Sequence, residues 1–90
     1  MLRIAIADDH EIVRSGLEML IERIEGMQVH LRASSYAELM ELLEREGADC
    51  LILDLNLGDR NGIESVKHIS ERYPTLPILV LSAYPEEQYA

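Results

Sequence analysis

The chain has 90 residues, of which 48% are hydrophobic and 28% are charged, and its formal net charge is -9. This length allows one small domain, and the acidic balance argues against direct nucleic-acid binding, because clustered Lys and Arg are what hold phosphate backbones. Cys50 is the single cysteine, which excludes an internal disulfide and favours the reducing cytoplasm, and no apolar stretch approaches membrane-spanning length.

Apolar runs of strand length alternate along the chain with segments of helical periodicity. In chain order we expect a strand over residues 3–7, a helix over about 11–25, a strand over 27–33, a helix that Ser34 and Ser35 can cap and Gly47 ends, a strand over 50–55, a helix from 63 until Pro74, a strand over 77–82 and a further helix from Glu86. Apolar and polar residues alternate in the strand over 27–33, which is typical of a half-exposed edge strand, whereas the other strands are mainly apolar.

Strands that alternate with helices predict a parallel sheet with helices on both faces and right-handed crossovers. The half-polar strand belongs at an edge, which favours the strand order 2-1-3-4 and a doubly wound, flavodoxin-like α/β fold for the single domain over residues 1–90. In that order the first and third strands are neighbours where the winding reverses, and ligands bind outside the carboxyl ends of strands at such a point.

Acidic residues stand at the carboxyl ends of both of these strands. Asp8 and Asp9 follow the first strand, and Asp54 closes the apolar run that starts at Cys50. A buried charge is costly unless it is paired, and three like charges in one small volume require a cation. Mg²⁺ fits best, because it typically takes one or two carboxylates and keeps several waters. Zinc would need His or Cys ligands, and only His10 is close in sequence.

We expect Asp9 and Asp54 to bind the metal and Asp8 to hold its waters. If Asn56 contacts the metal, we expect it to do so through its backbone carbonyl and not through its side-chain amide. Asp54 is then a candidate nucleophile, because a carboxylate can attack phosphorus to give an acyl phosphate while the metal neutralises charge on the transferring group. Ser82, at the end of the fourth strand, could donate a hydrogen bond to a phosphoryl oxygen and sense the phosphorylated state.

Each of these residues also has a purely structural explanation. Asp8 or Asp9 could cap the first helix, Asp54 could be a satisfied carboxylate at a strand end, and Ser82 could be an ordinary hydroxyl. Asn56 is more often a turn residue than a side-chain ligand. The histidines are scattered along the sequence and are expected to be solvated: His10, His30 and His68.

Together these segments resemble the receiver domain of bacterial two-component response regulators. The motifs that carry the resemblance are Ala7-Asp8-Asp9-His10, Leu53-Asp54-Leu55-Asn56-Leu57 at the end of the third strand, Asn61-Gly62 before the third helix, and Leu81-Ser82 after the fourth strand. The acidic start followed by Arg14-Ser15-Gly16-Leu17 is similar to the subgroup that carries a LuxR-type (NarL/FixJ) helix-turn-helix output domain.

The resemblance implies that Asp54 accepts a phosphoryl group from the phosphohistidine of a sensor histidine kinase, and that a DNA-binding output domain, absent from this segment, then regulates transcription. Asp8, Asp9, Asp54 and the carbonyl of Asn56 would form the Mg²⁺ site, and Ser82 would be the switch hydroxyl. The chain would be a cytoplasmic phosphoacceptor and not a turnover enzyme, with no direct contact to nucleic acid or membrane.

Two departures from the family pattern bear on this expectation. Gly58 stands where the family commonly has Pro. The fifth strand, with its essential Lys, and the fifth helix are expected to be missing, because the chain ends before both, and phosphorylation by small donors should then be weakened. The fourth strand would be an exposed edge, through which we expect a homodimer or a domain-swapped oligomer to form.

Three other functions fit parts of the pattern. A phosphorylation-independent pseudo-receiver that acts as a dimerisation module would usually have lost one of the acids. A phosphohydrolase with an Asp nucleophile would usually carry a second acid where this chain has Asn56. A flavin-binding module would need a Ser/Thr-rich cradle for the flavin phosphate.

Overall fold

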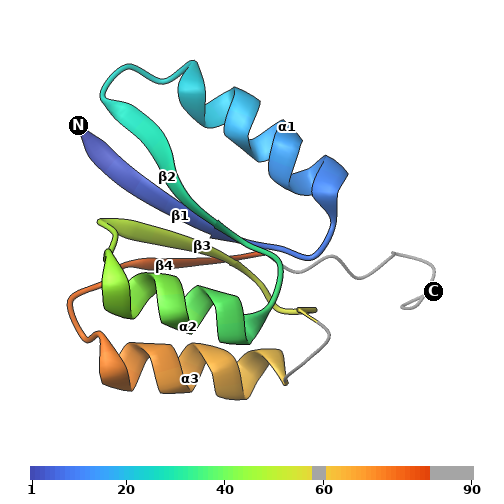
Figure 1. The fold of residues 1–90 in the computed structure, drawn as a ribbon, viewed down its shortest axis with the longest axis vertical. Helices are drawn as coiled ribbons and strands as arrows, with labels where there is room; N and C mark the ends of the chain where they lie inside the picture. The colour runs from blue at the N-terminus through green and yellow to red at the C-terminus, as the bar shows by residue number, and fades with distance from the viewer. Residues whose placement is uncertain (58–60, 82–90) are drawn as a thin grey trace.

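The strands form one parallel sheet in which the second strand of the chain lies at one edge, followed by the first, the third and the fourth, as the sequence predicted (Figure 1). The computed structural model describes residues 1–57 and 61–81. In chain order these residues form β1 (Leu2–Ala7), α1 (Glu11–Glu22), β2 (Met27–Ala33), α2 (Tyr36–Arg45), β3 (Cys50–Asp54), α3 (Gly62–Arg72) and β4 (Ile78–Leu81). No helix in the described ranges is both long enough and apolar enough to cross a bilayer.

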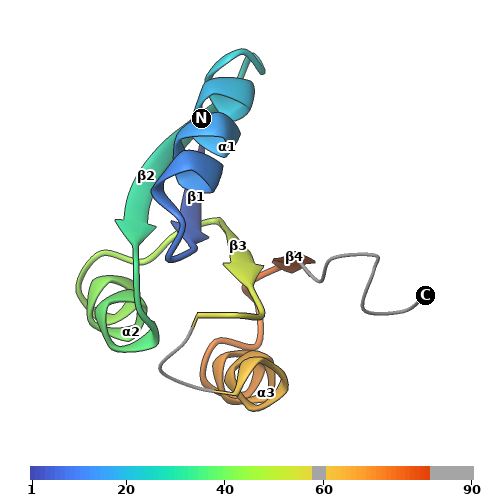
Figure 2. The same ribbon diagram turned by 90° about the vertical axis from the view of Figure 1, so that its right-hand side faces the viewer.

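Helices cover both faces of the sheet, with α1 on one face and α2 and α3 on the other (Figure 2). The alternation of side chains along β1 explains this arrangement, because successive residues of a strand point to opposite faces. Ile4 and Ile6 belong to the buried cluster on the α1 side, whereas Ala5 and Ala7 belong to the cluster on the α2 and α3 side. The central strands are therefore apolar throughout because both of their faces are buried.

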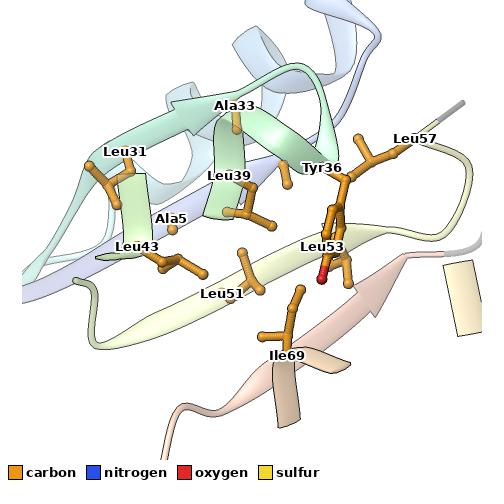
Figure 3. Close-up of a cluster of buried hydrophobic side chains, with 11 residues drawn as sticks. Ala5, Leu31, Ala33, Tyr36, Leu39, Leu43, Leu51, Leu53, Leu57 and Ile69 are labelled. Carbon is orange, nitrogen blue, oxygen red and sulfur yellow. The ribbon is translucent and has the colours of Figure 1, made fainter. Parts of the chain in front are cut away.

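The larger hydrophobic cluster lies between the sheet and the two helices α2 and α3 (Figure 3). Leu39 of α2, Leu51 and Leu53 of β3 and Ile69 of α3 are all fully buried in it. This cluster ties β3 to both helices, so it fixes the position of the strand that ends at Asp54.

Polar side chains set the start of two helices. Ser35 caps α2 by accepting a hydrogen bond from the backbone N–H of Glu38, and Asn61 caps α3 by accepting from the N–H groups of Ile63 and Glu64. Gly47, which follows α2, has a φ of 72°, a conformation that L side chains rarely adopt. Of the two predicted caps of α2, Ser35 is confirmed, and so is Gly47 as the stop signal.

Several predicted boundaries differ from the structure by a few residues, and one predicted helix lies outside the described residues. α1 ends at Glu22 and not near residue 25, because the N–H groups of Arg23 and Ile24 bond three residues back, to Leu20 and Ile21, in a tightened final turn. β3 ends at Asp54, one residue before the predicted end. The predicted helix from Glu86 lies outside the described residues.

β4 lies at one edge of the sheet within the described residues and exposes apolar side chains. Leu79 is 57% exposed and Val80 is 38% exposed, in agreement with the expectation that this strand is an exposed edge. β2 forms the other edge, as its alternating pattern predicted. The exposure on β4 is compatible with the expected association through this strand, which stays a prediction.

Close approach of α3 to the segment after β3 makes Gly62 irreplaceable. A Cβ atom on Gly62 would overlap the backbone carbonyl oxygen of Leu55 and lie 2.8 Å from its Cα. Gly62→Ala must therefore displace the backbone next to Asp54, and we expect it to lower the free energy of unfolding by about 2 kcal/mol or more.

Gly16→Ala is the matched control, because a Cβ on this exposed residue of α1 would meet nothing within 4 Å. We expect it to stabilise the protein by about 0.5 to 1 kcal/mol, since glycine is unfavourable inside a helix. Urea unfolding of both variants checks the pair. Equal effects of the two substitutions would contradict the close approach at Gly62.

Candidate functional site

Parallel pairing of β1 with β3 brings the predicted acidic residues together. Ala7, the last residue of β1, is the register partner of Leu53, so Asp8 and Asp54 each come one residue later on neighbouring strands. Both strands end at the same edge of the sheet (Figure 1). Ligand atoms of Asp8, Asp9, Asp54 and His10 all lie within 4.8 Å of one another. The predicted convergence of the three carboxylates is confirmed.

Two of the three carboxylates are buried and held by backbone N–H groups. Asp8 is 3% exposed, and its Oδ1 accepts a hydrogen bond of 2.7 Å from the N–H of His10. Asp54 is 1% exposed, and its Oδ1 accepts a bond of 3.0 Å from the N–H of Asn56. Asp9 is exposed. The buried pair is therefore fixed in direction, whereas Asp9 lies at the side of the cluster that solvent reaches.

The second carboxylate oxygen of Asp54 is a buried atom that no described residue of the protein satisfies. Oδ2 of Asp54 is buried and has no hydrogen-bond partner among the described residues. A buried carboxylate oxygen without a donor is costly, and two more carboxylates beside it increase that cost. A bound cation would remove both penalties, so the donor set fits a divalent metal ion.

His10 is solvent-exposed, as predicted, but it also belongs to this cluster, which was not predicted. Its side chain is 60% exposed, yet Nδ1 lies 2.9 Å from Oδ1 of Asp9, 3.1 Å from Oδ1 of Asp8 and 3.8 Å from Oδ2 of Asp54. The hydrogen bond with Asp8, followed by the charge of Asp9, raises the pKa of the His10 imidazole above its ordinary value. Its place directly after the acidic pair was the available sequence signal.

The explanation of Asp8 and Asp9 as helix caps is wrong. The N-cap residue of α1 is His10, and its side chain makes no capping hydrogen bond. Oδ1 of Asp8 accepts from the N–H of His10, which precedes the first helical residue. Asp8 thus orients the entry into α1 without satisfying the N–H groups of its first turn.

For the other two predicted site residues, Asn56 and Ser82, the structure gives only part of the predicted geometry. Asn56 is half-buried and follows Asp54 by two residues, and its N–H is committed to Asp54. A metal contact through its carbonyl stays a prediction. Ser82 lies outside the described residues, but Leu81 is the register partner of Asp54. His30, whose Nε2 lies 3.4 Å from Glu46, and the exposed His68 are remote from the cluster in sequence and belong to other elements.

A comparison with protein families matches the response regulator receiver domain over residues 4–90. Among curated proteins, the oxygen regulatory protein NreC of Staphylococcus haemolyticus (strain JCSC1435) is 35% identical over 89 residues, which are 98% of this chain and 41% of NreC. The DNA-binding transcriptional activator DevR/DosR of Mycobacterium tuberculosis (strain ATCC 25618 / H37Rv) is 35% identical, over 98% of this chain and 41% of that protein. The chain thus spans about two fifths of the length of these relatives.

Solved structures give the same result. The isolated REC domain of RcsB from Salmonella enterica serovar Typhimurium, in the presence of the phosphomimetic BeF3-, superposes with a TM-score of 0.87 and 35% sequence identity, over 92% of this chain and 62% of that one. A two-component response regulator of the LuxR family from Aurantimonas sp. SI85-9A1 superposes with a TM-score of 0.85 and 32% identity, over 99% of this chain and 64% of that one.

When no metal is present, repulsion among the carboxylates should lower the free energy of unfolding by a measurable amount. In Asp54→Asn the amide oxygen can still accept the N–H of Asn56, and the amide NH₂ can donate to a neighbouring carboxylate. We therefore expect this variant to unfold with a free energy about 1 kcal/mol higher than the original chain in EDTA.

Glu71→Gln is the control for net charge, because Glu71 is an exposed acid at the other end of α3 from its Asn61 cap. It should change the free energy of unfolding by less than about 0.5 kcal/mol. Urea titrations in EDTA compare the three proteins. A loss of stability in Asp54→Asn would mean that the carboxylate is already satisfied and that the cluster needs no cation.

Proposed function

Because the chain belongs to the response regulator receiver domain family, we propose that Asp54 accepts a phosphoryl group in two-component signalling. The observation that carries this proposal is the buried Oδ2 of Asp54, which has no hydrogen-bond partner among the described residues and faces a cluster of acidic ligands. An oxygen whose lone pairs are uncommitted can act as the nucleophile, while Oδ1 stays held by the N–H of Asn56.

The proposed step transfers a phosphoryl group from a phosphohistidine to Asp54. The carboxylate oxygen attacks phosphorus, a P–O bond forms, the P–N bond to the donor imidazole breaks, and the released nitrogen takes up a proton. Asp54 then carries an acyl phosphate. Beyond supplying the nucleophile, the protein would contribute positioning and charge neutralisation.

Asp8, Asp9 and Asp54 would hold a Mg²⁺ ion, with the backbone carbonyl of Asn56 as a further ligand. The ion would neutralise the carboxylates and the charge that builds up on the transferring phosphoryl oxygens. Asp8 is oriented for this role by the N–H of His10, and Asp54 by the N–H of Asn56. Ser82 is the proposed switch hydroxyl that would bond to a phosphoryl oxygen.

We further propose that the donor is a sensor histidine kinase and that the chain is a stoichiometric acceptor in the cytoplasm, not a turnover enzyme. DevR/DosR, which is longer than this chain, is named as a DNA-binding transcriptional activator, and this name motivates a DNA-binding output domain as the target of the switch. We do not expect this segment to contact nucleic acid or membrane directly. A homodimer or swapped oligomer through β4 would present the exposed Leu79 and Val80 to a second copy.

The alternative is a pseudo-receiver that dimerises and ignores phosphate. The geometry favours the phosphoacceptor, because a module without phosphate chemistry has no use for two buried acids whose charges repel. The two functions differ in one observable, which is the incorporation of a phosphoryl group at Asp54.

Phosphorylation of the protein at its full natural length, with acetyl phosphate and Mg²⁺, tests the proposal. We expect the mass of one phosphoryl group per chain, mapped to Asp54 and removed by hydroxylamine, as an acyl phosphate requires. Asp54→Asn should abolish it, and Asp9→Asn should slow it by at least about tenfold because a metal ligand is weakened.

Asp49→Asn is the matched control, because Asp49 is an acid that lies just before the start of β3, at the opposite end of the strand from Asp54. Its carboxylate accepts a hydrogen bond from Arg3 and takes no part in the cluster. Its rate should equal that of the original protein. Incorporation that survives Asp54→Asn, or no incorporation with acetyl phosphate or with a histidine kinase, would contradict the proposed function.

A further inference from the structure

We propose that His10 is a fourth ligand of the cation site, an inference that rests on the proposed function. This ligand makes the site prefer a late first-row divalent cation such as Ni²⁺ or Co²⁺ over Mg²⁺. The juxtaposition behind this inference is a ring nitrogen that faces all three carboxylates. Nδ1 of His10 lies within 4 Å of an oxygen of Asp8, of Asp9 and of Asp54.

The distances suit shared coordination. Two ligand atoms that are each about 2.1 Å from a metal and at right angles lie about 3.0 Å apart. Nδ1 of His10 is 2.9 Å from Oδ1 of Asp9 and 3.1 Å from Oδ1 of Asp8. The distance of 3.8 Å to Oδ2 of Asp54 is the one that must shorten on binding. Only a small movement of the exposed imidazole is needed.

An independent observation points to a ligand at this place. Oδ2 of Asp54 is buried, lies on the His10 side of the cluster and has no hydrogen-bond partner among the described residues. A metal ion between Nδ1 and Oδ2 would satisfy this oxygen. This buried oxygen, and not only the number of acidic residues, therefore points to a bound cation.

The backbone of His10 is anchored, and its ring contacts the carboxylates of the cluster itself. Its N–H donates a 2.7 Å bond to Oδ1 of Asp8, and the residue holds the N-cap position of α1 without a capping side-chain bond. The fixed backbone thus places the imidazole beside the cluster. The side chain is 60% exposed there. Truncating this side chain removes the nitrogen without opening the core.

Ligand chemistry decides which cation benefits. Mg²⁺ takes oxygen ligands at near-octahedral geometry, and an imidazole adds little to its affinity. Imidazole nitrogen suits Ni²⁺, Zn²⁺ and Cu²⁺, and affinity for nitrogen and oxygen sites rises from Mn²⁺ through Co²⁺ and Ni²⁺. In a site of three carboxylates and one imidazole, His10 therefore increases the difference in affinity between the two classes of cation.

A rival explanation is that His10 is only a counter-cation. In that case the imidazole competes with any metal for the carboxylates, and its removal should strengthen the binding of Mg²⁺ and Ni²⁺ alike. If His10 is a ligand, its removal should weaken Ni²⁺ and Co²⁺ selectively. The two explanations predict opposite signs for the change in Ni²⁺ affinity.

Isothermal titration calorimetry of the untagged protein at its full natural length, with MgCl₂, NiCl₂ and CoCl₂ in turn, tests the proposal. For His10→Ala we expect a loss of about tenfold or more in affinity for Ni²⁺ and Co²⁺, and a change of less than about threefold for Mg²⁺. The visible absorption of bound Co²⁺ should also shift in the variant, because a nitrogen ligand is replaced by water.

His68→Ala is the matched control, since it removes an exposed histidine of α3 and should leave all three affinities unchanged. Equal weakening of all metals in His10→Ala, or tighter binding of all of them, would overturn the role of His10. Asp54→Asn separates this failure from that of the proposed function. If Asp54→Asn leaves the affinity for Mg²⁺ unchanged, the proposed cation site itself is wrong. If Asp54→Asn lowers the affinity for Mg²⁺ but His10→Ala leaves the affinity for Ni²⁺ unchanged, only the role of His10 is wrong.

Discussion

Electrostatic repulsion among three carboxylates is the constraint on which the site depends. The parallel register of β1 and β3 holds two of them together, because Asp8 and Asp54 follow paired residues on adjacent strands. Both are almost fully buried, so water screens their charges poorly. The fold thus holds an unfavourable interaction that a cation could relieve, so the proposed metal site is a consequence of topology.

The hydrophobic layers keep that interaction in place. Residues of β1 alternate between the cluster under α1 and the cluster under α2 and α3, so a shift of the strand would expose apolar side chains on both faces. Gly62 brings the start of α3 against the backbone of Leu55, next to Asp54. The acidic residues therefore meet on a rigid support, which is what the positioning of a phosphoryl group requires.

The strand order and the acidic cluster could be predicted from the sequence because both follow from simple patterns. The half-polar run over Met27–Ala33 indicated an edge, and the apolar runs that end in Asp8 and Asp54 indicated neighbours in the centre. The direction of the His10 ring could not be predicted, since it depends on the N-cap backbone of α1 and on a bond to Asp8. The end of α1 was missed because hydrogen bonds in its last turn tighten without a change in apolar spacing.

Chemical shifts in ¹H–¹⁵N NMR spectra during a Mg²⁺ titration test the central claim most directly, because they report on each residue of the rim. The account predicts saturable shifts centred on the amides of Asp8, Asp9 and Asp54, and their loss in Asp54→Asn. Shifts that do not saturate, that lie away from the carboxyl ends of β1 and β3, or that persist in Asp54→Asn would contradict it.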